Sequence, residues 1–131
     1  MVDLNEAIVV AKKALTRAHA PYSNYKVGAA LVCKNDKIYS GCNVENHGIM
    51  SICAERVAFS KAISEGDKDF SYIVICAGKD LNELDDSIPC GYCRQFMSEF
   101  VDKNFIVYAL GPNDKITSYT IQDLLPHNFS L

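Results

Sequence analysis

The chain has 131 residues, of which 49% are hydrophobic and 22% charged, and its 13 basic and 16 acidic side chains give a net charge of −3. This length suits one domain with a sizeable core, so we expect residues 1–131 to form a single domain. Nucleic-acid-binding proteins carry basic stripes that neutralise phosphates, whereas no Lys/Arg run here exceeds the pair Lys12-Lys13. The composition therefore argues against a nucleic-acid partner and favours a small-molecule substrate.

The first fifteen residues, MVDLNEAIVVAKKAL, are charged and amphipathic, which is not the pattern of a signal peptide. No apolar run approaches the roughly 20 residues that cross a bilayer. We therefore expect a cytoplasmic protein with no membrane partner, whose thiols stay reduced. Its six cysteines then indicate core packing, metal binding or catalysis rather than a disulfide framework.

The first half of the chain predicts a helix, a hairpin and a second helix. The first helix is expected over 3–20, with a capping-box pattern at its start and Pro21 ending it. Residues 25–33 and 37–46 have the composition of two strands joined by the turn KND. Helical spacing returns over 51–66, and the final glycine is a common C-terminal stop.

The second half continues with alternating strands and helices. Residues 71–78 form an apolar run of strand length, which a polar loop separates from a helix over 90–100. A strand over 105–110, a short edge strand over 115–119 and a short helix over 120–125 complete the chain. This order predicts an α/β fold with a mixed sheet of about five strands and helices on its faces.

Two motifs, CAER and PCGYC, hold three of the six cysteines. Cys90 and Cys93 are three residues apart, so on a helix they lie on nearly the same face. Within a regular helix, Cys53 and Glu55 point about 200° apart. Both reach one site only if Cys53 lies at the N-terminal tip of its helix, where free N–H groups also stabilise a thiolate. A redox pair explains the second motif alone and leaves CAER without a role.

The other possible zinc ligands have positions that favour other roles. The remaining cysteines lie in predicted strands with apolar neighbours, which is typical of core packing. The three histidines form no HxxxH or similar pair, and only one lies close in sequence to the predicted site. These residues are Cys33, Cys42, Cys76, His19, His47 and His127. Three thiolates leave a fourth zinc position open, which is the arrangement of catalytic rather than structural zinc.

Motifs along nearly the whole chain resemble the zinc-dependent cytidine deaminases of the small-chain, homotetrameric type. CAER followed by PCGYCRQ matches the signature of zinc deaminases, and APYSNYKVGAAL, GCNVEN and LLPHNF resemble further segments of that family. The resemblance implies a three-layer α-β-α fold of the cytidine-deaminase type. It also implies hydrolytic deamination of cytidine and deoxycytidine to uridine and deoxyuridine, with release of ammonia, in pyrimidine salvage.

The same resemblance assigns roles at the reacting centre. One Zn²⁺ per chain would be held by Cys53, Cys90 and Cys93, and Glu55 would be the catalytic proton shuttle. Zinc lowers the pKa of bound water from about 15.7 towards 7, and one carboxylate can serve first as base and then as acid. The alternative for Glu55 is a solvated residue on a helix surface.

Further residues would bind the substrate. Asn43 and Glu45 would hydrogen-bond the sugar, chiefly its 3′-hydroxyl, and Tyr25 would lie against the base where the family usually has Phe. The backbone of Ala54 would meet the reacting edge of the base. Phe129 would close the site of a neighbouring subunit in a homotetramer. Without the resemblance, NVEN fits a polar hairpin end better than a binding segment, and isolated aromatic residues usually belong to a core.

A role for Arg56 is predicted separately, from the charge of the zinc site. Zinc with three thiolates carries a net charge of −1, which opposes ionisation of a bound water. Arg56 lies three residues after Cys53 and therefore returns to the same helix face, where its guanidinium can donate to sulfur. We expect it to compensate the charge together with the two helix N-termini. The alternative is a surface arginine paired with an acidic residue.

The segment HGIMSI departs from the family pattern, because it is one residue shorter and has Ile49 and Met50 where an aromatic residue is common. Contacts to the 5′ end of the sugar are therefore not carried over to this chain. Three alternatives to a nucleoside deaminase remain open: deamination of another cytosine-bearing molecule such as a nucleoside antibiotic, editing of a polynucleotide, and a non-catalytic zinc module.

Overall fold

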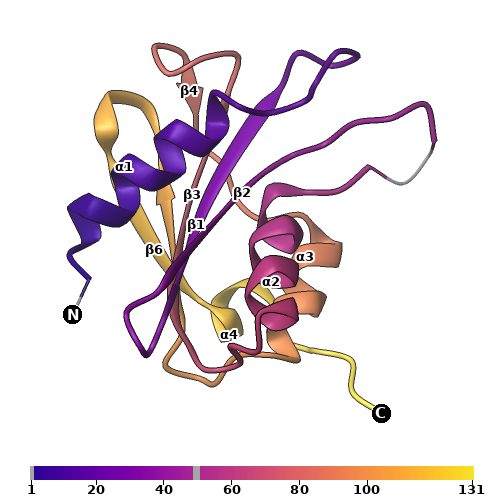
Figure 1. Ribbon diagram of the computed structural model, residues 1–131. Helices are drawn as coiled ribbons and strands as arrows, with labels where there is room; N and C mark the ends of the chain where they lie inside the picture. The colour runs from indigo at the N-terminus through magenta and orange to yellow at the C-terminus, as the bar shows by residue number, and fades with distance from the viewer. Residues whose placement is uncertain (1, 49–50) are drawn as a thin grey trace.

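A mixed sheet runs through the centre of the computed structural model, which describes residues 2–48 and 51–131 (Figure 1). Its main strands pair in the order β2-β1-β3-β5-β6, and a short strand, β4, pairs with β3. The elements in chain order are α1 (Leu4–Leu15), β1 (Lys26–Cys33), β2 (Ile38–Cys42), α2 (Ala54–Ser64), β3 (Phe70–Gly78), β4 (Leu84–Asp85), α3 (Gly91–Ser98), β5 (Ile106–Leu110), the 3-10 turn η1 (Pro112–Asp114), β6 (Ile116–Thr120) and α4 (Ile121–Leu124).

Strand directions place the starts of α2 and α3 at one edge of the sheet. β1 is antiparallel to both β2 and β3, so the end of β3 lies beside the start of β1, with Gly78 opposite Lys26. β3 and β5 are parallel, and such a pair needs a crossover, which contains α3. Helix α2 follows β2 and α3 follows β3, so each begins near the end of β3. In open α/β sheets, ligands bind outside this carboxyl edge of the strands.

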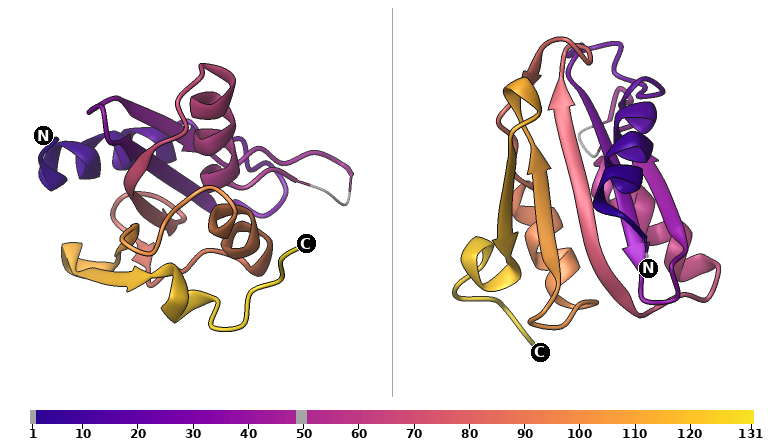
Figure 2. Two further views of the ribbon diagram at one scale, coloured as in Figure 1. Left: turned by 90° about the horizontal axis from the view of Figure 1, so that it is seen from below. Right: turned by 90° about the vertical axis from the view of Figure 1, so that its left-hand side faces the viewer.

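The helices cover both faces of the sheet, which confirms the predicted three-layer α-β-α architecture (Figure 2). On one face, α1 packs Ala7, Ala11 and Leu15 against β1 and β3. On the other, α2 and α3 pack against the opposite side of the same strands around Phe59 and Met97. The apolar runs of β1 and β3 are therefore buried on both faces. No helix among the described residues combines the length and hydropathy of a membrane span.

Three elements differ most from the sequence prediction, and one of them is the strand predicted over 37–46, which ends at Cys42. Helix α1 ends at Leu15 rather than near residue 20, because the backbone of His19 pairs with the segment after β2. The His19 N–H donates to the Asn43 carbonyl (3.0 Å), and the Glu45 N–H donates to the His19 carbonyl (2.8 Å). The predicted polar loop before α3 contains β4, whose two residues are too few for a periodicity to reveal.

Candidate active site

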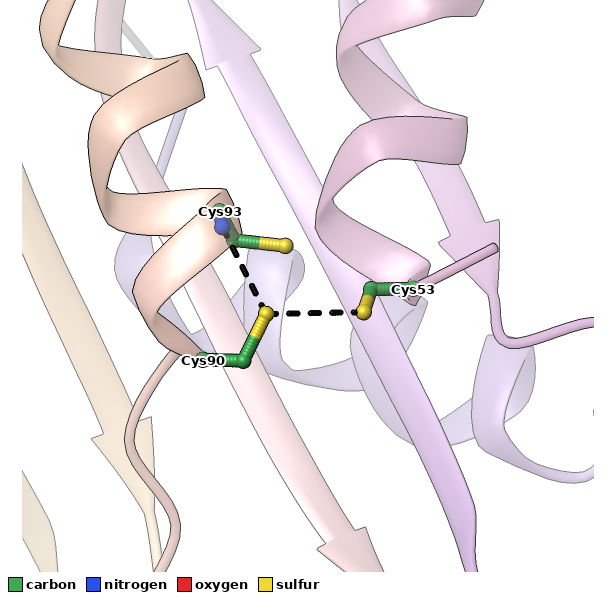
Figure 3. Close-up of side chains that lie close together, drawn as sticks. All are labelled: Cys53, Cys90 and Cys93. Carbon is green, nitrogen blue, oxygen red and sulfur yellow. Dashed lines mark hydrogen bonds between the residues drawn. The ribbon is translucent and has the colours of Figure 1, made fainter. Parts of the chain in front are cut away.

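Three sulfur atoms converge where α2 and α3 begin (Figure 3). Cys53 is the N-cap of α2, Cys90 is the N-cap of α3, and Cys93 lies buried in the first turn of α3. All three sulfurs lie within 4.8 Å of one another, and the Cys53 and Cys90 sulfurs are 3.7 Å apart. As the opposing directions of Cys53 and Glu55 required, Cys53 precedes the first helical residue. Among the described residues, no other Cys, His, Asp or Glu cluster could hold a metal ion.

This cluster suits zinc in its donor type and spacing. Zn–S bonds of about 2.3 Å in a tetrahedron place two sulfurs about 3.8 Å apart, close to the Cys53–Cys90 separation. The free N–H groups of two helix N-termini also favour negative charge at the cluster. One of them, the Cys93 N–H, donates to the Cys90 sulfur at 3.4 Å.

Within the cluster, Cys53 is the acidic thiol, and its hydrogen bond to Cys93 raises the pKa of the Cys93 thiol. Hydrogen bonds from the Cys93 thiol and the Arg56 guanidinium lower the pKa of the Cys53 thiol to about 5. Burial instead raises the pKa of Cys33 and of Cys76 to about 11. Cys42 is half-buried and its thiol donates to the Arg17 carbonyl. Cys33 and Cys76 are therefore core residues, as predicted, and their raised pKa values disfavour the thiolate form that binds metal. Cys42 lies outside the core and outside the sulfur cluster.

The side chain of Glu55 is buried beside the sulfur cluster. It is only 4% exposed, and it is the one buried charged residue that the described core contains. Burial raises the pKa of Glu55 to about 7. A solvated surface position, which the sequence left open, is therefore wrong.

Glu55 owes its depth to a close helix-to-sheet approach. A Cβ added to Gly41 on β2 would lie 2.3 Å from the Ala54 carbonyl oxygen, so only glycine lets the first turn of α2 come so near the strand.

Arg56 connects the cluster to the segment before α2. One terminal nitrogen of its guanidinium, Nη2, donates to the Cys53 sulfur at 3.5 Å and to the Ser51 carbonyl at 3.2 Å. No ion pair to an acidic side chain holds it among the described residues. The geometry thus matches the predicted contact with sulfur rather than a surface ion pair.

A cavity of about 430 Å³ extends from the cluster to the loop after β2. Cys53, Cys90 and Glu55 line one end, and Tyr25, Asn43 and Glu45 line the remainder with several apolar residues. Its volume is within the range of small-molecule sites, about 300–1,000 Å³. The structure therefore brings the predicted substrate-binding side chains into one space with the sulfur cluster.

Hydrogen bonds to residues 22–27, around the start of β1, hold Asn43 and Glu45 in place. The Asn43 amide donates to the Tyr25 carbonyl (2.8 Å) and accepts from the Val27 N–H (2.9 Å). The Glu45 carboxylate accepts from the Tyr22 N–H (3.0 Å), the Ser23 N–H (3.2 Å) and the Ser23 hydroxyl. The Ser23 hydroxyl is the main cause that keeps the pKa of Glu45 below its ordinary value.

Two of the predicted substrate-binding residues, Ala54 and Phe129, do not line the cavity of their own chain. Ala54 is buried in the first turn of α2, between Cys53 and Glu55. Phe129 lies on the C-terminal tail and is 65% exposed, and Gln95 binds its backbone with two hydrogen bonds, of 2.9 and 3.3 Å. The loop prediction on Ile49 and Met50 falls outside the described residues.

Asp86, Ser87 and Ile88 form a third wall of the cavity, which the motifs in the sequence do not predict. The Ser87 hydroxyl is buried and has no hydrogen-bond partner among the described residues. In the sequence they belong to a polar loop, and their position directly before Pro89 and Cys90 is the signal that links them to the cluster.

This chain matches a family model, relatives and a solved structure that are all of deaminases. Residues 1–109 match the family model of the cytidine and deoxycytidylate deaminase zinc-binding region. The chain is 39% identical over 130 residues to the cytidine deaminase of Sporosarcina psychrophila, covering 98% of this chain and 93% of the relative. It is 32% identical over 130 residues to the blasticidin-S deaminase of Bacillus cereus, covering 95% and 91%.

A solved structure extends the similarity to the whole fold. The crystal structure of cytidine deaminase from Burkholderia pseudomallei matches with a TM-score of 0.87 and 35% sequence identity. The match covers 98% of this chain and 100% of that chain.

Proposed function

The chain belongs to the cytidine and deoxycytidylate deaminase zinc-binding family, and on this premise we propose that it hydrolyses cytidine and deoxycytidine to uridine and deoxyuridine, with release of ammonia. The observation that carries the proposal is the arrangement of the cavity. A buried carboxylate, Glu55, adjoins three sulfurs at one end, and Asn43 and Glu45 offer polar groups to a sugar at the other.

Cys53, Cys90 and Cys93 would hold one zinc ion per chain, and two of them, Cys53 and Cys90, line the cavity. When bound, zinc supplies a water whose pKa is lowered towards 7 and which is therefore nucleophilic near neutral pH. The negative charge of three thiolates opposes this lowering of the pKa of the water. The positive charge of Arg56, which contacts the Cys53 sulfur, offsets part of that negative charge.

Glu55 moves the protons of the reaction. It accepts a proton from the attacking water and delivers it to ring N3, which makes C4 more electrophilic. It then takes the second proton from the oxygen now bonded to C4 and passes it to the exocyclic amine. The C4–N bond breaks, ammonia leaves, and the oxygen remains as the C4 carbonyl. Its burial excludes bulk water from these transfers, and general acid–base catalysis of this kind contributes about 10²–10⁴-fold.

The other end of the cavity orients the nucleoside. The Asn43 amide and Glu45 carboxylate retain lone pairs and an N–H beyond their backbone bonds, and these bind the sugar, chiefly at its 3′-hydroxyl. Tyr25 lies against the base, and the backbone of Ala54 meets its reacting edge. Binding energy from the sugar supports the chemical step at C4.

We further propose that this single-domain chain works as a cytoplasmic homotetramer in pyrimidine salvage. Phe129 is exposed and outside its own cavity, which suits a residue that closes the site of a neighbouring subunit. Six free cysteines fit a reducing compartment. A net charge of −3 disfavours a polynucleotide substrate.

A second candidate substrate is a cytosine-bearing nucleoside antibiotic. The observation in its favour is the 32% identity to a blasticidin-S deaminase, which spans nearly the whole chain. The same zinc ligands and Glu55 would serve this reaction, and only the far end of the cavity would bind a different group.

The test is deamination by purified protein carrying one zinc per chain. We expect cytidine absorbance to fall with release of one ammonia per nucleoside, and expect a chelator to stop the reaction until zinc is restored. Zinc-loaded protein that leaves cytidine and deoxycytidine unchanged would refute the proposal and favour a non-catalytic zinc module. Faster turnover of blasticidin S than of cytidine at equal concentration would establish the second candidate instead.

A further inference from the structure

Tyr92 occupies an unusual place between two of the clustered cysteines. It is in the first turn of α3, and the side chain is 56% exposed although a large aromatic ring gains from burial. Its ring lies over the guanidinium of Arg56, with the Arg56 Cζ atom 4.3 Å from the ring centroid. Tyr92 therefore joins α3 to α2 beside the sulfur cluster.

The rest of the Arg56 environment leaves one face of the guanidinium to this ring. Nη2 is shared between the Cys53 sulfur and the Ser51 carbonyl. The Nε atom is buried and has no hydrogen-bond partner among the described residues. An N–H that is removed from water without an acceptor is costly, and contact of the cation with an aromatic face offsets part of that cost.

We propose that Tyr92 is a positioning residue that holds the Arg56 guanidinium against the Cys53 sulfur. The inference rests on the proposed zinc site, and it gives a role to Tyr92, which lies inside the PCGYC motif but is not one of the predicted site residues. Tyr92 touches neither sulfur nor substrate in this role. It covers the guanidinium, keeps water from competing for it, and limits it to the orientation in which Nη2 reaches Cys53.

The expected contribution of Tyr92 to activity follows from the energy of cation–π contacts. Cation–π pairs at exposed sites are worth about 0.5–1 kcal/mol, which corresponds to about a 2- to 5-fold change in an equilibrium. Tyr92→Leu, which removes the ring, should therefore lower kcat/KM about 2- to 5-fold. Tyr92→Phe keeps the ring and should match the wild type, because the hydroxyl is not part of the contact.

Cobalt(II) in place of zinc gives a readout independent of turnover. A hydrogen bond from a cation lowers the energy of sulfur electrons, so its loss shifts the thiolate-to-cobalt charge-transfer band to longer wavelength. We expect this shift in Tyr92→Leu and a larger one in Arg56→Gln. We expect no shift in Tyr92→Phe or in Tyr22→Leu, a control at another tyrosine that is 56% exposed.

The decisive comparison is Tyr92→Leu made in the Arg56→Gln background. If the ring acts through Arg56, the second substitution adds no loss of kcat/KM and no band shift. A loss or shift as large as in the wild-type background would overturn the inference, as would a wild-type spectrum for Tyr92→Leu alone. Failure of the proposed function would look different, because the wild type and every variant would then leave cytidine unchanged, whatever their cobalt spectra.

Discussion

At the reacting end of the cavity, Glu55 and the three sulfurs come from the first turns of two helices, whereas Asn43 and Glu45 at the other end come from the irregular segment after β2. The two glutamates show the contrast most clearly. Burial raises the pKa of Glu55, while the Ser23 hydroxyl and two backbone N–H groups lower the pKa of Glu45.

The difference separates chemistry from positioning. A buried carboxyl with its pKa near neutrality exchanges protons readily, whereas a carboxylate held by three donors stays ionised and fixed in place. Environments that move the pKa values of two carboxyls apart commonly mark different roles. Substitutions at the reacting end should therefore remove activity. Substitutions at the sugar end should lower kcat/KM only by the amount that the loss of one hydrogen bond causes.

The largest effect should follow loss of a metal ligand. Cys90→Ala should lose zinc and all measurable turnover, because two thiolates hold the ion far more weakly than three. Metal analysis of purified protein checks this, with Cys76→Ala as the control at a buried cysteine outside the cluster. Zinc absent from the Cys76 variant but present in the Cys90 variant would disprove the assignment.

Next in size is Glu55→Gln. An amide cannot carry the proton, so we expect turnover to fall about 10²–10⁴-fold with zinc and fold retained. Steady-state rates and metal content are measured together, with Glu65→Gln, at the exposed end of the same helix, as the control. More than about a tenth of wild-type activity in Glu55→Gln would exclude it as the shuttle.

Arg56→Gln should have an intermediate effect. Groups that contact metal ligands typically change activity or affinity by about 10–100-fold, and we expect a loss in this range. Arg56→Lys should lose less, because it keeps the charge but not the planar fork. Arg17→Gln, at an exposed position, is the control. Wild-type rates in Arg56→Gln would show that the helix N-termini compensate the charge without it.

Within each of its two motifs, the reacting end was predictable from sequence because the geometry is local, whereas the resemblance implied that the motifs, 37 residues apart, share one site. The spacing of Cys90 and Cys93 fixes a shared helix face, and Cys53 has to be an N-cap for Glu55 to reach the same site. The five main strands were likewise visible as apolar runs, whereas the sixth strand, β4, was not.

The rest of the site depends on contacts between distant segments, which a periodic pattern does not encode. Helix α1 stops early because His19 pairs with residues that follow β2. Ser87 lines the cavity because β4 pairs with β3 and directs the chain back to α3. The ring of Tyr92 lies over Arg56 only after α2 and α3 are packed side by side.

At the sugar end, Glu45→Gln should lower kcat/KM about ten-fold, in line with the loss of one charge-assisted hydrogen bond. The amide oxygen can still accept from the Tyr22 and Ser23 N–H groups, so the turn should persist. Glu83→Gln, an exposed residue outside the cavity, is the control. A loss as large as that of Glu55→Gln would mean that the two ends do not differ as described.

The smallest change in kcat/KM should follow removal of the 2′-hydroxyl from the substrate. Because Asn43 and Glu45 are proposed to bind chiefly the 3′-hydroxyl, cytidine and deoxycytidine should differ less than about three-fold in kcat/KM, below the worth of one hydrogen bond. 3′-Deoxycytidine should lose about ten-fold with wild-type protein and almost nothing further with Glu45→Gln, since the partner is then already weakened. Equal losses from the 3′-deoxy substrate in both proteins would show that Glu45 does not contact that hydroxyl, and a large penalty for deoxycytidine would move the contact to the 2′ position.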